Sequence, residues 1–257
     1  MRLMLLTTAT LVLSLLAPTL SAQEAKQKSA AQKSAEGKKG AQKKNKEAGF
    51  KKIFNGQDLS GWKGNEELWS VEDGAITGRT TADKPLKFNT FLIWEEGPVA
   101  NFELRLDYKI VDGNSGIQYR SRVLNEEDYI VGGYQADIDA TMKFAGINYE
   151  EKARGILAQR GQRVTIAEDG TKTVETFGDA AELGEKIHGD DFNSYRLVAR
   201  GNKLSHYIND QLMSEVIDNE AGKAASEGVL AFQVHQGPPM VIQFKNVRLK
   251  TIKQVNK

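Results

Sequence analysis

The order of apolar and polar positions after residue 50 is typical of a β protein. Residues 103–110 read ELRLDYKI, so Leu104, Leu106 and Tyr108 share one face of a predicted strand. Similar short runs continue to residue 250, separated by turn-forming stretches such as DGNSG, EDG and GPP. No internal repeat and no alternation of strands with long helices accompanies them. The pattern predicts an all-β fold, a β-sandwich or jelly roll of two antiparallel sheets.

Local signals add detail to this fold. Residues 194–216 read SYRLVARGNKLSHYINDQLMSEV, where Gly201-Asn202 and Asn209-Asp210 predict two tight turns and therefore a three-stranded meander. Two short helices are expected, around residues 149–154 and around residues 179–185.

Three predicted strands carry an unusual polar face. Their polar positions hold fork-shaped or bidentate groups instead of the Lys, Glu and Thr common on a solvated sheet. The polar positions are Gln118, Arg120 and Arg122 in the first strand, Gln135, Asp137 and Asp139 in the second, and Gln233 with His235 in the third; the Gln, Arg and Asp side chains are the fork-shaped or bidentate ones. Planar bidentate groups suit vicinal hydroxyls, so the faces indicate sugar binding. Three ordinary exposed faces are the alternative that alternation leaves open.

The N-terminal region has the features of an exported protein. Residues 1–22 contain Arg2, an apolar stretch of about 14 residues and small residues up to Ala22, which predicts a secretory signal peptide, with an uncleaved N-terminal anchor as the alternative. Residues 23–49 are rich in Lys and Ala and lack aromatic residues, so a disordered linker is expected. The folded domain is predicted over residues 50–252, in a periplasmic or extracellular location.

The composition and net charge exclude several kinds of site and partner. The chain has no cysteine, which excludes disulfides, thiolate metal sites and a lipoprotein anchor. The net charge is +1; removing the linker (8 Lys − 3 Glu = +5) and Arg2 (+1) leaves −5 for the remainder. A mildly acidic domain does not have the excess of basic residues that is typical of nucleic-acid-binding proteins. The expected partner is a sugar substrate, with no nucleic acid and no membrane span after signal cleavage; the sequence leaves the oligomeric state open.

Other chemical motifs are scarce. The sequence has no G-x-S-x-G elbow, no P-loop and no H-E-x-x-H. His188 and His206 are expected to be structural or exposed. No metal site or cofactor is predicted, although Asp137 and Asp139 leave room for a divalent cation such as Ca²⁺. Trp94 is a candidate stacking platform for a sugar ring.

Several stretches together resemble one known family. They are IFNGQDLSGW at 53–62, FLIWEEGPVANFELRLDYKIVDGNSGIQYRS at 91–121 and GVLAFQVHQGPPMVIQFKNVRLK at 228–250. The chain resembles the 3-keto-disaccharide hydrolases, formerly domain of unknown function 1080. The resemblance implies a concanavalin A-like jelly roll, usually exported by bacteria, that acts on sugars oxidised at C3. In that family the strand commonly ends in His-Gly or His-Gly-Gly, whereas here His235 is followed by Gln-Gly-Pro-Pro.

The resemblance implies a glycoside hydrolase or lyase that abstracts the C2 proton of a 3-keto-glycoside and eliminates the aglycone, with or without later hydration. His235 is the candidate base, Asp137 the acid or second base, and Arg120 the group that stabilises the enolate. Asn114, Gln118, Gln135, Gln233 and Trp94 are the candidate substrate-binding residues.

Two alternatives belong to other classes. A non-catalytic carbohydrate-binding module of the cell envelope would keep the bidentate groups and need no titratable base. A conventional jelly-roll glycanase would carry a Glu-x-Asp-x-x-Glu strand, and that motif does not occur in the sequence.

Overall fold

The computed structural model describes residues 47–189 and 191–253. The chain divides into two compact units, Met1–Ala48 and Gly49–Lys257, and nearly all of the described residues belong to the second. The predicted signal peptide (1–22) and most of the predicted linker (23–49) lie outside the described residues. Both assignments therefore stay predictions.

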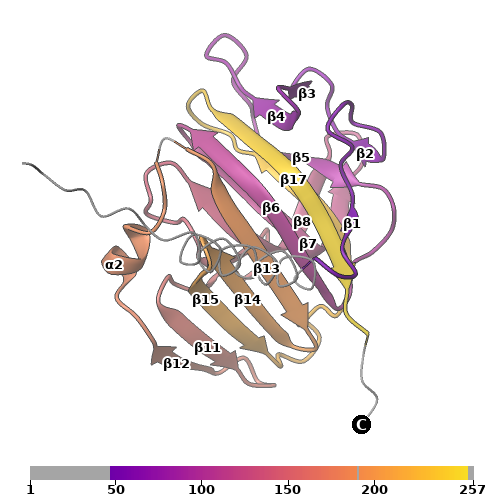
Figure 1. Cartoon of the computed structure of the whole chain (residues 1–257). Helices are drawn as coiled ribbons and strands as arrows, with labels where there is room; N and C mark the ends of the chain where they lie inside the picture. Colours follow the sequence, from indigo (N-terminus) through magenta and orange to yellow (C-terminus); the bar gives the residue numbers. More distant parts are fainter. Residues whose placement is uncertain (1–46, 190, 254–257) are drawn as a thin grey trace, which may run out of the picture. The chain divides into compact units, whose positions relative to one another are not determined.

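The described residues form two sheets with one short helix, α2 (Ala180–Gly184) (Figure 1). The larger sheet has ten strands. In spatial order they are β12 (Lys172–Thr176), β11 (Gln162–Ile166), β15 (Gln211–Asp218), β14 (Lys203–Ile208), β13 (Asn193–Arg200), β6 (Phe102–Val111), β17 (Val241–Thr251), β4 (Ala75–Arg79) and β3 (Trp69–Glu72), with β1 (Lys51–Lys52) paired to β17. All pairs are antiparallel except β11 with β15.

The second sheet has seven strands, all paired antiparallel. Their spatial order is β10 (Gly155–Ala158), β9 (Asn148–Glu151), β8 (Ile130–Asp139), β7 (Asn114–Asn125), β16 (Val229–Val234), β5 (Thr90–Trp94) and β2 (Trp62–Lys63). Neighbours such as β7 and β16 are far apart in sequence, which is the connectivity of a jelly roll. The predicted all-β sandwich is confirmed.

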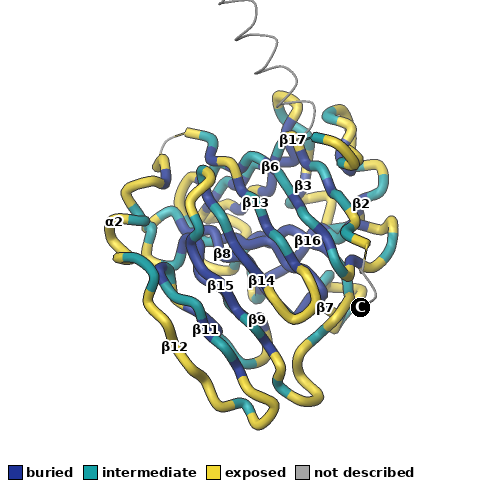
Figure 2. The backbone as a smooth tube through the Cα atoms, turned by 60° about the horizontal axis from the view of Figure 1, so that its bottom comes forward, coloured by how far each residue is buried: buried dark blue, intermediate teal, exposed yellow. Residues whose placement is uncertain are grey.

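The core lies between the two sheets. Along β6 the burial alternates at every residue from Phe102 to Ile110, as the apolar and polar alternation predicts. Phe232 of one sheet stacks on Phe244 of the other, with ring centroids 4.0 Å apart, so aromatic rings join the two layers. In Figure 2 the buried colour follows the middles of the strands, whereas the edge strand β12 is exposed along its length.

The predicted meander is confirmed as β13, β14 and β15. Asn209 and Asp210 adopt positive φ angles of 49° and 63°, the conformation that a tight two-residue hairpin turn requires. The helix expected at 179–185 is also confirmed, because the Asp179 carboxylate accepts from the backbone N–H groups of Ala181 and Glu182 and caps α2.

The helix expected at 149–154 is wrong. Residues Asn148–Glu151 form strand β9, which pairs with β8 on one side and β10 on the other. The helix-forming residues of this segment gain more from the sheet hydrogen bonds on both sides than from an isolated turn of helix. Lys152, with a φ angle of 58°, then reverses the chain.

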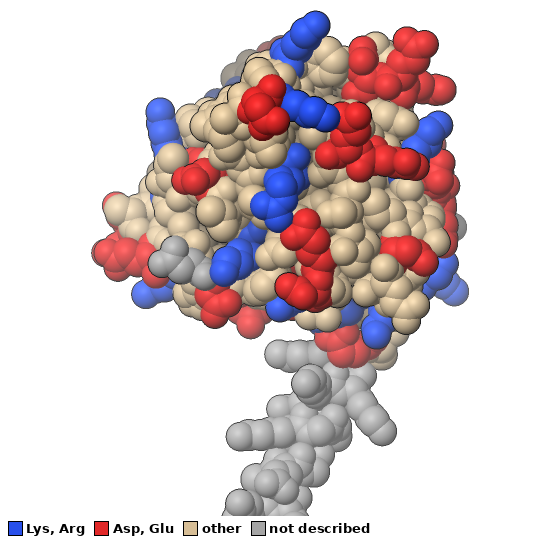
Figure 3. Space-filling model, turned by 90° about the horizontal axis from the view of Figure 1, so that it is seen from above, with Lys and Arg blue, Asp and Glu red and all other residues tan. Residues whose placement is uncertain are grey.

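In the part of the chain that the structure describes, no helix has the length and apolarity needed to cross a membrane. On the face drawn in Figure 3, acidic and basic side chains are interspersed, so that face has no continuous basic area of the kind that binds nucleic acid. The absence of a nucleic-acid partner stays a prediction.

Candidate active site

The polar face of β8 is the floor of a cavity of about 790 Å³. Gln135, Asp137 and Asp139 point into the cavity, although each is nearly buried. The alternate residues, Tyr134 and Ala136 among them, pack in the core between the sheets. Alternation along one strand thus separates the site from the core. The cavity lies on the face of the seven-stranded sheet that points away from the larger sheet.

A glycine makes room for the side chain of Gln135. Gly116 on β7 lies beside Asp137 in the sheet register, and the Gln135 side chain crosses over it. A Cβ at Gly116 would lie 2.5 Å from Cδ of Gln135, which is closer than real Cβ contacts allow. Any other residue at position 116 would therefore displace Gln135 from the cavity floor.

A chain of hydrogen bonds fixes the orientation of the Gln135 amide. The Ser121 hydroxyl donates to Oε1 of Gln118 at 2.6 Å, and Nε2 of Gln118 donates to Oε1 of Gln135 at 2.6 Å. Nε2 of Gln233 donates to the same Gln135 oxygen at 3.1 Å. Because Oε1 of Gln135 is held by two donors, its Nε2 must face Asp137, where it donates to Oδ1 at 3.2 Å. We call these side chains the amide relay.

Asp137 carries the strongest chemical signal in the cavity. Its Oδ1 accepts from Nδ2 of Asn114 at 3.1 Å as well as from Gln135, whereas Oδ2 accepts no hydrogen bond from the described residues. Burial raises the pKa of Asp137 to about 7; the two amide donors oppose this rise, and the charges of Asp139 and Glu151 add to it. A carboxyl with this pKa can give or take a proton near neutrality.

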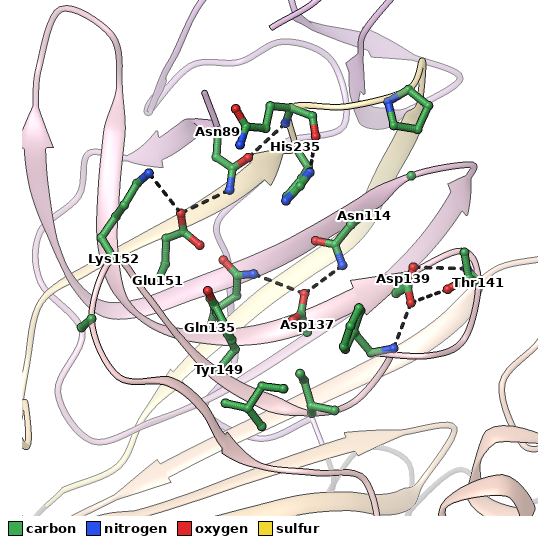
Figure 4. Close-up of a pocket in the computed structure, with 17 residues that line it drawn as sticks. Asn89, Asn114, Gln135, Asp137, Asp139, Thr141, Tyr149, Glu151, Lys152 and His235 are labelled. Carbon is green, nitrogen blue, oxygen red and sulfur yellow. Dashed lines mark hydrogen bonds and ion pairs between the residues drawn. The ribbon is translucent and has the colours of Figure 1, made fainter. Parts of the chain in front are cut away.

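His235 follows directly after β16 and lies at the edge of the same cavity. Its imidazole points into the cavity on the side of Asn114 (Figure 4). Asn89 holds this loop: its Oδ1 accepts from the backbone N–H of Gln236 at 3.0 Å, and its Nδ2 donates to Oε1 of Glu151 at 3.2 Å. His235 Nδ1 also contacts the carbonyl oxygen of Gln236. The Gln-Gly-Pro-Pro stretch therefore contributes to the cavity, since Gln236 and Pro238 both line it.

Of the lining residues that were not expected from the sequence, three come from one segment. Tyr149, Glu151 and Lys152 come from β9 and the turn after it, the segment for which a helix was predicted. Lys152 Nζ lies 4.0 Å from a carboxylate oxygen of Glu151 (Figure 4). Burial and the charges of Glu151 and Asp137 raise the pKa of Tyr149. The signal that could have found these residues is the alternation of Asn148 and Glu150 with Tyr149 and Glu151.

Asp139 is held by its own loop. Its Oδ2 accepts from the Thr141 hydroxyl at 2.7 Å and from the Phe144 backbone N–H at 2.9 Å. Its Oδ1 accepts from the Thr141 backbone N–H at 3.2 Å. The carboxylate thus shapes the loop at the cavity wall. Among the described residues no group of three or more His, Cys, Asp or Glu side chains has a geometry suited to a metal ion.

Arg120 does not line the cavity. The register between β7 and β8 shifts between Tyr119 and Arg122, and Arg120 has a φ angle of 48°. This bulge inserts one residue and turns the Arg120 side chain away from the face that carries Gln118. Its guanidinium donates to the carbonyl oxygens of Ala100 and Gly201, each at 2.7 Å. Burial and these acceptors indicate that Arg120 joins loops and does not contact a ligand in the cavity.

The other expected binding residues divide into two groups. Asn114 and Gln135 line the cavity with His235 and Asp137. Gln118 and Gln233 are fully buried behind Gln135 and contact it as members of the amide relay. Trp94 is a core residue that pairs with Trp62 across β5 and β2, and it does not line the cavity.

Comparison with known proteins identifies the family. Residues 49–250 match the family described as 3-keto-alpha-glucoside-1,2-lyase-like domain. The chain belongs to this family. No curated protein sequence matches the chain.

Solved structures show the same fold. One is a proposed glycosyl hydrolase from Parabacteroides distasonis ATCC 8503, with a TM-score of 0.52, 15% identity, and coverage of 79% of this chain and 99% of that chain. A second proposed glycosyl hydrolase from the same organism has a TM-score of 0.50 and 21% identity, with coverage of 82% and 97%. At these identities the likeness shows the jelly-roll fold alone. Together with the family match, it assigns the chain to a carbohydrate-active jelly-roll family.

Proposed function

We propose that this 3-keto-alpha-glucoside-1,2-lyase-like chain is an exported enzyme that cleaves 3-keto-glycosides by abstracting the C2 proton and eliminating the aglycone. The observation that carries the proposal is the buried carboxyl of Asp137, which faces the same cavity as His235 and has a pKa of about 7. A non-catalytic binding module has no need for a carboxyl that titrates near neutrality.

The first step is proton abstraction. The C3 ketone acidifies the proton on C2, and His235 takes that proton as the base. The electron pair moves into the C2–C3 bond, and the carbonyl becomes an enolate oxygen. Imidazole is the side chain that most often serves as a general base in enzymes.

The second step expels the aglycone. The enolate reforms the C3 carbonyl, a C1–C2 double bond forms, and the bond from C1 to the leaving oxygen breaks. Asp137, protonated in a large fraction of molecules near pH 7, donates its proton to that oxygen. Its Oδ2, to which no described residue donates a hydrogen bond, is the oxygen available for this role. Water adding across C1–C2 afterwards would complete a net hydrolysis.

The enolate needs a positive partner during the reaction. Arg120 was the expected residue, but its guanidinium is engaged with backbone carbonyls outside the cavity. Of the described residues lining the cavity, Lys152 is the one Lys or Arg, and it assumes this role in the proposal. Asn114 and Gln135 would position the sugar hydroxyls.

The test uses 4-nitrophenyl 3-keto-glucoside beside the unoxidised 4-nitrophenyl glucoside. Nitrophenol should be released from the keto sugar only, and deuterium at C2 should slow the release. His235→Ala should lower kcat by about 10²–10⁴-fold. The matched control is His188→Ala, since His188 is exposed and does not line the cavity.

Each contrary result has a definite meaning. Release from both substrates would support a conventional glycanase. Binding of the keto sugar without release would support a carbohydrate-binding module. Full activity in His235→Ala would remove His235 from the role of base.

A further inference from the structure

The face of the seven-stranded sheet that forms the cavity changes from polar to apolar across its strands. Gln118 on β7 pairs with Gln135 on β8, Gln135 pairs with Tyr149 on β9, and Tyr149 pairs with Ile156 on β10. Direct cross-strand partners project to the same side of a sheet. The four residues therefore form one continuous row that begins with amides and ends with an aliphatic side chain.

Apolar residues also lie directly beside Asp137, the proposed acid. The backbone N–H of Asp137 donates to the Ile147 carbonyl at 3.3 Å, and the Gly146 N–H donates to the Asp137 carbonyl at 3.0 Å. Ile147 therefore lies next to Asp137, and its side chain also lines the cavity. Phe144 is brought to the same wall by the hydrogen bond from its backbone N–H to Asp139.

Together Phe144, Ile147, Tyr149 and Ile156 form an apolar wall of the cavity, and this wall is partly open to solvent. Phe144, Tyr149 and Ile156 are only partly buried, although each faces the cavity. The polar groups at this wall are the hydroxyls of Tyr149 and Thr141, and the Thr141 hydroxyl already donates to Asp139. A ligand with many hydroxyl groups would find few partners here, whereas an apolar ring would displace water from apolar surface, which is favourable.

We propose that this wall, formed by Phe144, Ile147, Tyr149 and Ile156, binds the leaving group and selects a neutral aromatic or aliphatic aglycone over a second sugar. The inference rests on the proposed function, because it assigns the sugar ring to the polar side of the cavity. The leaving oxygen is bonded to C1, next to the C2 that loses its proton, so the aglycone must continue from the neighbourhood of Asp137. The apolar wall begins there.

The experiment compares a phenyl 3-keto-glucoside with a 3-keto-disaccharide as substrates of the full chain. Ile156→Asn should lower kcat/KM for the phenyl substrate about tenfold, and change kcat/KM for the disaccharide less than twofold. Phe144→Ser is a second variant, in case Ile156→Asn does not fold. Val174→Asn is the matched control, because Val174 is exposed on β12 and does not line the cavity.

Binding measurements separate this inference from the proposed function. Calorimetry on Asp137→Asn with unoxidised phenyl glucoside and with an unoxidised disaccharide requires no turnover. Tighter binding of the phenyl glucoside, lost in the double variant with Ile156→Asn, would support the apolar subsite even if no keto sugar were cleaved. Equal losses on both ligands, or tighter binding of the disaccharide, would overturn it.

Discussion

A polar cluster lies against each face of the seven-stranded sheet, and the two clusters differ in what they can do. The inner cluster consists of Tyr119, Asn148 and His206, which hydrogen-bond to one another between the sheets, with Tyr119 Oη 2.9 Å from His206 Nε2. The outer cluster consists of the amide relay, Asn114 and Asp137 on the cavity side. Gln118 and Tyr119 are neighbours on β7, so a single step along one strand leads from one cluster to the other.

Burial acts on both clusters with opposite consequences. It lowers the pKa of His206 to about 3 and raises the pKa of Asp137 to about 7, because in each case the charged form is disfavoured. His206 is thereby held neutral throughout the physiological range, whereas Asp137 titrates in the middle of it. The same desolvation produces an inert structural group on the sealed face and a reactive group on the face with a cavity.

The largest effect is expected for Asp137→Asn, which keeps the size of the side chain and removes its titration. We expect kcat on a 3-keto-glycoside to fall about 10²–10⁴-fold if Asp137 is the acid. The measurement is steady-state turnover at pH 7. A decrease of less than threefold would show that the carboxyl is not required.

The same variant has a stability signature. The folded-state pKa of Asp137 is raised, so between about pH 4 and pH 7 the folded state binds more protons than the unfolded state, and stability falls as the pH rises. Asp137→Asn should therefore be more stable than the parent protein above pH 7, by on the order of a few kcal/mol, and gain little near pH 4. Denaturant unfolding at pH 4.5 and pH 8 measures both.

A smaller effect, confined to stability, is expected for Arg120→Ala. The variant removes the buried Arg120 side chain and its hydrogen bonds to Ala100, Gly201 and Asn101, so unfolding should become easier by about 3 kcal/mol. Turnover per folded molecule should change less than twofold, because Arg120 does not line the cavity. A selective loss of kcat with normal stability would return Arg120 to the role of enolate partner.

The fold was largely predictable because alternation and turn chemistry are local signals. The meander, the capped helix at Asp179 and the polar face of β8 all follow from spacing within one segment. The position of Arg120 was not predictable in this way. One bulge between Tyr119 and Arg122 moves the Arg120 side chain to the other face of the sheet, and no pattern in the sequence indicates that bulge.

The set of residues that line the cavity could not be predicted from the sequence, because it depends on contacts between residues that are far apart in the chain. Asn89 and Glu151 are 62 residues apart, and their hydrogen bond joins the His235 loop to β9. No pattern along the chain indicates that pairing. Gln118 and Gln233 were expected to hold a ligand, yet they are buried behind Gln135, since the sequence shows which face carries a residue but not what covers that face.

A third variant, His206→Leu, tests the inner cluster. It removes the partner of Tyr119 and Asn148, which should cost about 2 kcal/mol of stability at pH 7. The folded-state pKa of His206 is lowered, so its contribution is present above about pH 6.5 and lost as the pH falls towards 3. The variant should therefore lose less stability on acidification than the parent protein. Equal acid sensitivity in both proteins would contradict the buried neutral state.

The smallest expected effect is the most specific to the outer cluster. Gln118→Leu removes one of the two donors that hold the Gln135 oxygen, so the Gln135 amide points at Asp137 for less of the time. The hydrogen bond from Gln135 lowers the pKa of Asp137, so weakening it should raise that pKa and shift the corresponding limb of the pH–rate profile upward, by less than about one unit.

The matched control for this variant is Gln243→Leu. Gln243 lies on β17 of the larger sheet and donates to the Thr77 hydroxyl at 3.3 Å, so the same substitution there should leave the profile in place. The pH–rate profile separates a positioning effect from general destabilisation, because a destabilised protein loses amplitude at every pH without moving the limb. An unmoved limb in Gln118→Leu would show that Gln233 alone suffices to orient Gln135 towards Asp137.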